Sequence, residues 1–159
     1  MFAVGLAALA PWTSLLEFGA IPAGYRTGHS QRTFLQDGRR MAAAWAANVA
    51  YRDIPAADPP NRTLERFPSS GIIVWAQITS PPVAFDGRRV TTTYRLDHAY
   101  RFPCCEAAAI AGGEREMYGF GPKRRHSVVI RVYFASPPNR PAIQHAQRAI
   151  DALRLPDVS

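Results

Sequence analysis

The sequence predicts an α+β fold in which a single, mainly antiparallel sheet carries a C-terminal amphipathic helix packed on one face. Two runs of strand length, Ile72–Thr79 and Ser127–Phe134, are rich in β-branched and other apolar residues. The residues from Asn139 to Pro156 contain the start and stop signals of a helix. A length of 159 residues fits one domain with one hydrophobic core.

The first strands are predicted from a turn. Asp37-Gly38 lies between residues 31–35 and the run that starts at Met41, which is typical of a β-hairpin. The run 41–51 is ambiguous, because its alanines and a four-residue apolar spacing favour a helix. Its alternation from Trp45 to Tyr51 and the preceding turn favour a strand, and we expect a strand there.

Three further segments extend the predicted sheet. The consecutive β-branched residues at the start of Ile72–Thr79 indicate a central strand that is buried on both faces and ends at Pro81-Pro82. Val90–Leu96 alternates Thr and Tyr as an edge strand does. Glu114–Phe120 is expected to extend the sheet by a further strand.

The helix at the C-terminus has the clearest boundaries. Asn139 is a preferred N-cap, Pro141 falls in the first turn where proline is tolerated, and Pro156 is expected to end the helix. Apolar residues recur at helical spacing and predict the face that packs on the sheet. These residues are Ile143, Ala146, Ile150 and Leu153.

The N-terminal residues 1–23 have the composition of an export or anchor segment, and residues 24–159 form the predicted domain. Glu17 is the only charged residue of this segment. The apolar stretch is short for a membrane span, and no basic residue precedes it as in a signal peptide. Three readings stay open: the truncated end of a signal or membrane helix, an interfacial helix with Trp12 and Phe18 at headgroup level, or a helix packed on the domain. Export or anchoring is favoured.

The formal net charge of +7 comes almost entirely from arginine, since Lys123 is the single lysine. A basic chain is attracted to phosphates and to anionic lipids. The basic runs Arg39-Arg40, Arg88-Arg89 and Lys123–Arg125 are separated by acidic residues along the chain. This pattern favours a solvated surface over a nucleic-acid footprint.

Cys104 and Cys105 are the two cysteines of the chain and lie next to each other. In an oxidising compartment they are candidates for a vicinal disulfide, which would be strained and easily reduced. Free or buried thiols, an intermolecular bridge, and redox or metal chemistry with His98 are the alternatives. The Cys-x-x-Cys motif of redox proteins and the paired ligand spacing of zinc sites are both absent, so we expect no metal and no cofactor.

Motifs of hydrolytic or nucleotide-binding enzymes are also absent from the sequence. No Gly-x-Ser-x-Gly turn and no phosphate-binding glycine loop follow a predicted strand. Aromatic residues offer a different kind of site. Trp45, Tyr51, Trp75 and Tyr133 could line a ligand pocket, although such residues more often form plain core.

Several runs carry a resemblance to known proteins. They are RFPCCE at residues 101–106, AGGE at 111–114, VVIRVYF at 128–134, Pro137-Pro138, and the helical AQRAIDAL at 146–153. In these runs the chain from about Gly24 onward resembles uncharacterised exported or membrane-anchored actinobacterial proteins. Its strand–proline–helix ending is also similar to PsbP/Mog-one-like sandwiches, most of which are binding modules. The resemblance implies a fold and a location, and no functional residue.

These observations predict a non-enzymatic, extracytoplasmic domain, secreted or membrane-anchored, that binds a protein or an envelope component. Contact with a membrane would come from the N-terminal segment. A redox or metal protein centred on Cys104-Cys105 is one alternative, and a basic nucleic-acid-binding domain is another.

Overall fold

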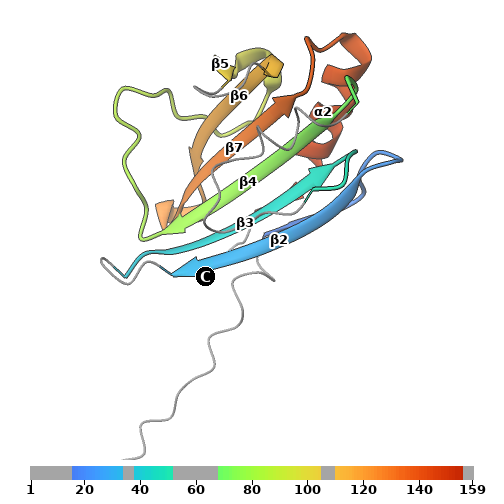
Figure 1. Cartoon of the computed structure of the whole chain (residues 1–159). Helices are drawn as coiled ribbons and strands as arrows, with labels where there is room; N and C mark the ends of the chain where they lie inside the picture. The colour runs from blue at the N-terminus through green and yellow to red at the C-terminus, as the bar shows by residue number, and fades with distance from the viewer. Residues whose placement is uncertain (1–15, 34–37, 52–67, 105–109, 156–159) are drawn as a thin grey trace, which may run out of the picture.

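The computed structural model describes residues 16–33, 38–51, 68–104 and 110–155. Its main feature is a six-stranded antiparallel sheet with the strand order β2-β3-β4-β7-β6-β5 (Figure 1). This agrees with the predicted α+β class and the mainly antiparallel sheet. The strands are β2 (Arg26–Thr33), β3 (Arg40–Ala47), β4 (Ile72–Ser80), β7 (Ser127–Phe134), β6 (Ile110–Phe120) and β5 (Tyr100–Cys104).

The two apolar runs lie in one sheet, as predicted, and they form its central pair of strands. β4 and β7 are antiparallel neighbours, with Ile72 opposite Phe134 and Thr79 opposite Ser127. The start of β4 is buried on both faces, because Ile73 and Val74 point to opposite sides and both have no exposed surface. Long β-branched side chains fit such doubly buried positions well.

A larger hydrophobic core lies on one face of the sheet, which we call the core face. The opposite face, marked by Trp75, Arg131 and Glu116 on neighbouring strands, is called the outer face. The buried residues of the core face form one cluster. Its members from the sheet are Ala42, Ala44, Ala46, Ile72, Val74, Ala76, Ile78, Met117, Val128, Ile130, Val132 and Phe134.

The expected hairpin is present between β2 and β3, with Thr33 opposite Arg40. The loop uses Gly38 at a φ of +70°, a conformation that suits glycine. In the run after the turn, strand formation prevails over the helical alternative. Only glycine fits at position 28 of this hairpin, because a Cβ there would lie 2.4 Å from the Trp45 ring.

The prediction of an edge strand at Val90–Leu96 is wrong. Val90 forms an isolated parallel bridge with Tyr118, and residues 96–98 form a 3-10 turn. The side chain of Gln147 binds this segment instead, accepting from the backbone N–H of Leu96 at 2.9 Å and donating to the carbonyl of Tyr94 at 2.9 Å. These bonds satisfy backbone groups that a strand would pair in a ladder. The strand at this edge of the sheet is β5, and β2 forms the other edge.

The helix α2 (Arg140–Asp151) begins as predicted and ends earlier. The Asn139 side chain accepts a hydrogen bond from the backbone N–H of Ala142 at 2.9 Å. The helix ends before Leu153, which the sequence placed on its apolar face. Instead, β8 (Leu153–Arg154) pairs with β1 (Glu17–Phe18) in a second, two-stranded sheet, so the expectation of a single sheet is corrected.

The end of the predicted N-terminal segment belongs to the domain. Leu16 is 1% exposed within the core cluster, and Phe18 and Ile21 pack against that cluster. The domain thus extends further towards the N-terminus than residue 24. Residues 1–15 lie outside the described residues. Within the described part of the chain, none of the helices combines the length and the apolar character needed to cross a bilayer.

Candidate functional site

The four aromatic residues predicted to form a pocket lie close together near β3, β4 and β7. Trp45 and Tyr51 meet edge to face with ring centroids 5.3 Å apart. Tyr51 and Trp75 pack against a small cluster that contains the buried Tyr133. These contacts form a second, smaller core on the outer face of the sheet.

Cys104, the first residue of the cysteine pair, lies at an edge of the sheet. Cys104 is the last residue of β5 and lies opposite Ile110 of β6. Cys105 lies outside the described residues, so the vicinal disulfide stays a prediction. His98, its suggested partner, has a 74% exposed side chain with its Nε2 atom 3.8 Å from an oxygen of Asp97. Among the residues that the structure describes, no three His, Cys, Asp or Glu side chains gather as metal ligands would.

A different group of side chains stands out on the outer face. Five aromatic rings form an unbroken line across β5, β6 and the loop that follows β4. In order, the ring centroids are 6.4 Å apart for Phe102 and Tyr100, 5.9 Å for Tyr100 and Tyr118, 5.0 Å for Tyr118 and Phe85, and 5.5 Å for Phe85 and Phe120.

Strand periodicity and register bring these rings to one side. Glu116, Tyr118 and Phe120 alternate along β6 and share the outer face, while Met117 between them is buried in the core cluster. Tyr100 of β5 lies opposite Glu116, which places the alternating aromatic residues of β5 beside those of β6. The line of rings therefore depends on a pairing between strands.

Arginines lie over both ends of this line. The guanidinium carbon of Arg88 is 4.9 Å from the ring centroid of Phe102, 5.1 Å from that of Tyr100 and 5.7 Å from that of Tyr118. At the other end, the guanidinium carbon of Arg124 is 4.2 Å from the Phe120 centroid. All four distances lie within the range of cation–π attraction. We call the five rings with Arg88, Arg89 and Arg124 the Arg–aromatic strip.

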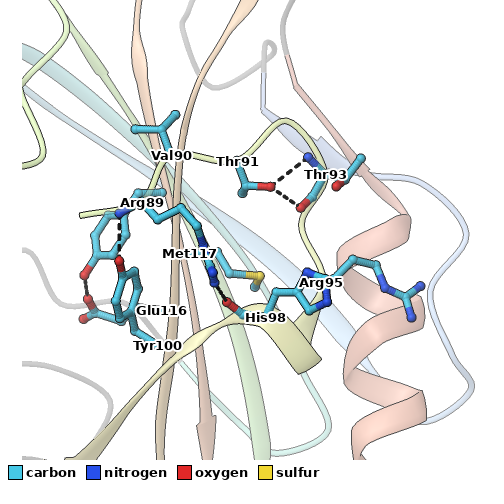
Figure 2. Close-up of a pocket in the computed structure, with 10 residues that line it drawn as sticks. Arg89, Val90, Thr91, Thr93, Arg95, His98, Tyr100, Glu116 and Met117 are labelled. Atoms are coloured by element: carbon cyan, nitrogen blue, oxygen red, sulfur yellow. Dashed lines mark hydrogen bonds between the residues drawn. The ribbon is translucent and has the colours of Figure 1, made fainter. Parts of the chain in front are cut away.

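A cavity of about 170 Å³ opens beside the strip and shares Arg89, Tyr100 and Tyr118 with it. Figure 2 shows Arg89 extending through this cavity towards His98. The backbone N–H of Arg89 donates to the Tyr100 hydroxyl at 2.8 Å, and its guanidinium donates to the carbonyl of His98 at 2.5 Å. Arg95 adds a second guanidinium to the cavity lining. The cavity is therefore small, and its lining combines two guanidinium groups with the carboxyl group of Glu116 and the apolar side chains of Val90 and Met117.

An ionic cluster lies on the outer face next to the strip. The Nε atom of Arg131 is 3.1 Å from a carboxylate oxygen of Glu116 and 3.4 Å from one of Glu114. The guanidinium carbon also lies 5.5 Å from the centroid of Trp75. The Tyr118 hydroxyl donates a short hydrogen bond to Glu116. The cluster therefore joins two carboxyl groups to one guanidinium and one ring of the strip.

Burial, together with the hydrogen bond and the charge of Glu116, raises the pKa of Glu114 to about 8 against the opposing charge of Arg131. Glu114 is therefore protonated at neutral pH. The remaining carboxylate of Glu116 balances the charge of Arg131, so the cluster carries no net charge near pH 7.

Comparison with models of protein families, with curated proteins and with solved structures gives no match for this chain. The site is therefore argued from its own geometry. The sequence identifies Arg88-Arg89 as a basic pair and predicts Glu114–Phe120 as a strand. It does not predict the contact between Arg88 and the Tyr118 ring of that strand. The alternation of Tyr118 and Phe120 was the available signal.

Proposed function

We propose that this chain is a non-enzymatic, extracytoplasmic binding domain that holds an anionic partner on the Arg–aromatic strip. One observation carries the proposal: a single exposed guanidinium, that of Arg88, lies within 5.7 Å of the centroids of three aromatic rings. Stacking holds an arginine side chain in place while its N–H groups stay directed along the plane of the guanidinium. An anion that binds there meets a donor that is already oriented.

The small size of the cavity indicates that it holds one small group of a larger partner rather than a whole ligand. Pockets for whole drug-sized molecules usually enclose about 300 to 1,000 Å³. The cavity beside the strip, at about 170 Å³, is smaller than this. A carboxylate or phosphate group attached to a protein or an envelope polymer fits such a volume and meets Arg89 inside it.

The helix α2 belongs to this proposal as the cover of the core face. Its buried residues Ala146, Ala149 and Ile150 belong to the same cluster as the apolar side chains of that face. In Figure 1 the helix lies behind β4 and β7. With the core face covered by α2, the outer face is the side of the sheet that a partner can reach.

The location outside the cytoplasm is supported by the sequence. The apolar composition of residues 1–15 and the resemblance to exported or anchored actinobacterial proteins both favour export. An envelope component is then the nearest source of anionic groups.

Single-stranded nucleic acid is the second candidate partner, because arginines and aromatic rings on an open sheet also form platforms for stacked bases. The two candidates differ in what the rings do. Bases need the faces of the rings, whereas a polymer without bases needs the arginines that the rings hold.

The test compares two double variants with the same loss of charge. R88Q/R89Q changes the strip, and R140Q/R148Q changes two exposed arginines of α2. Binding of polygalacturonate, inorganic polyphosphate and oligothymidylate is measured by microscale thermophoresis at fixed salt. We expect R88Q/R89Q to weaken the binding of polygalacturonate or polyphosphate by roughly tenfold or more, since charged hydrogen bonds are worth roughly 1.5 to 3 kcal/mol each.

The control variant is expected to bind almost as the wild type does. Equal losses in both double variants would show attraction to net charge alone and would contradict the proposal. Tight binding confined to oligothymidylate would favour the nucleic-acid candidate.

A further inference from the structure

The Arg–aromatic strip ends at the turn between β6 and β7, which carries Lys123, Arg124 and Arg125. Cations therefore lie along the strip and beyond its last ring, which favours a partner with many negative charges. We infer that the partner is a linear polymer with repeated anionic groups, which lies along the strip from the cavity at Arg89 to the turn between β6 and β7. This inference rests on the proposed function and adds the length and the path of the ligand.

The first argument is the separation of the cations along the strip. Arg88 lies over Tyr100 and Phe102 at one end, and Arg124 lies over Phe120 at the other. The rings of Tyr118 and Phe85 lie between these ends. A chain with repeated charges can contact both ends of this line of rings at once.

The second argument is the shape of the turn that follows Phe120. Lys123 and Arg124 both have a φ of 54°, in the left-handed region that residues with a Cβ rarely adopt. Backbone hydrogen bonds hold this conformation: the N–H of Arg124 donates to the carbonyl of Gly121 at 2.9 Å, and the N–H of Gly121 donates to that of His126 at 3.0 Å. Backbone strain of this kind is often retained at functional sites. Here it presents exposed cations at the end of the strip.

The third argument is the balance of charge along this path. Residues 117–127 contain three cations and no acidic residue. The acidic groups nearest to the strip on β6 are Glu114 and Glu116, and their cluster with Arg131 carries no net charge at neutral pH. A polyanion would therefore meet positive groups at both ends, and the one acidic residue of the loop segment 85–89 is Asp86, which is followed by Arg88 and Arg89.

The experiment is a chain-length series read with two variants. Tripolyphosphate and long-chain polyphosphate are compared for affinity per phosphate, and a galacturonate trimer and long polygalacturonate form a second arm that distinguishes phosphate from carboxylate repeats. We expect the long chains to bind about tenfold more tightly per charged group in at least one arm, because the second contact becomes intramolecular.

The variants locate that gain. K123Q/R124Q is expected to remove the advantage of the long chain, so that its affinity per charged group falls to that of the trimer, whereas R88Q/R89Q weakens both lengths. The salt dependence of long-chain binding should also become shallower in K123Q/R124Q, since fewer counterions are released. Circular dichroism and thermal unfolding verify that each variant is folded.

Each possible outcome decides one of the two proposals. Equal affinity per charged group for short and long chains would overturn the polymer inference and leave the proposed function standing. Binding of every probe that is insensitive to R88Q/R89Q would overturn the proposed function itself. A preference for oligothymidylate over both polymers would reject a ligand without bases.

Discussion

The carboxyl group of Glu114 sets the electrostatic character of the surface around it. It shares Arg131 with Glu116, and three titratable groups within one small area can carry a net charge of zero or of minus one. Because the pKa of Glu114 is raised to about 8, the neutral state of the cluster prevails at pH 7 and the negative state above pH 8. The sequence contains both glutamates at alternate positions, but their shared guanidinium comes from a neighbouring strand and could not be read from spacing.

The pH dependence of anion binding tests this account. Between pH 6.5 and 9 the wild type is expected to lose affinity for polygalacturonate, whose own carboxylates stay ionised throughout. The E114Q variant should bind with an affinity that hardly changes over this range. An affinity of the wild type that stays constant through pH 8, or the same decline in E114Q, would contradict the assignment.

The same group gives a prediction for stability. Its pKa is higher in the folded than in the unfolded protein, so the folded state retains a proton that the unfolded state releases above pH 4.5. Stability is therefore lost as the pH rises from about 4.5 to 8. Measured by urea unfolding, E114Q should gain stability relative to the wild type at pH 9, and no such gain should appear at pH 4.

At the scale of the element, the sequence was most informative where one short run determines the outcome. The strands β4 and β7 were predicted because continuous β-branched residues suit a buried position on both faces, whatever their neighbours are. The segment from Val90 to Leu96 could not be predicted in this way, because its backbone is bound by a distant residue. Gln147, which accepts a hydrogen bond from the N–H of Leu96, lies 51 residues further along the chain. The Arg–aromatic strip also depends on long-range pairing, since it needs the register of β5 against β6.

Gln147 therefore has a testable role as the tie between α2 and the segment that lines the cavity. Q147A should lower the free energy of unfolding by about 1 to 3 kcal/mol, because it leaves the N–H of Leu96 and the carbonyl of Tyr94 without their partner. Hydrogen exchange at the Leu96 amide should accelerate. Q144A, a change at an exposed position of the same helix, is the matched control. Equal stability of both variants would argue against the tie.

At the scale of the whole molecule, the two faces of the sheet differ in chemistry. The core face is almost entirely aliphatic, whereas the outer face carries aromatic rings, three arginines of the strip and the Glu114–Glu116–Arg131 cluster. The net charge of +7 was visible in the sequence and was interpreted as a solvated surface. In the folded protein, Arg88, Arg89 and Arg124 lie along one line of aromatic rings. Composition alone does not reveal this arrangement.

The most direct measurement of this central claim is an NMR titration of the arginine side chains with long-chain polyphosphate. The Nε–Hε resonances of Arg88, Arg89 and Arg124 should shift together and saturate at one affinity, while those of Arg140 and Arg148 on α2 stay almost unchanged. Uniform shifts across the arginines of both surfaces, or shifts confined to α2, would contradict the assignment of the strip as the binding surface.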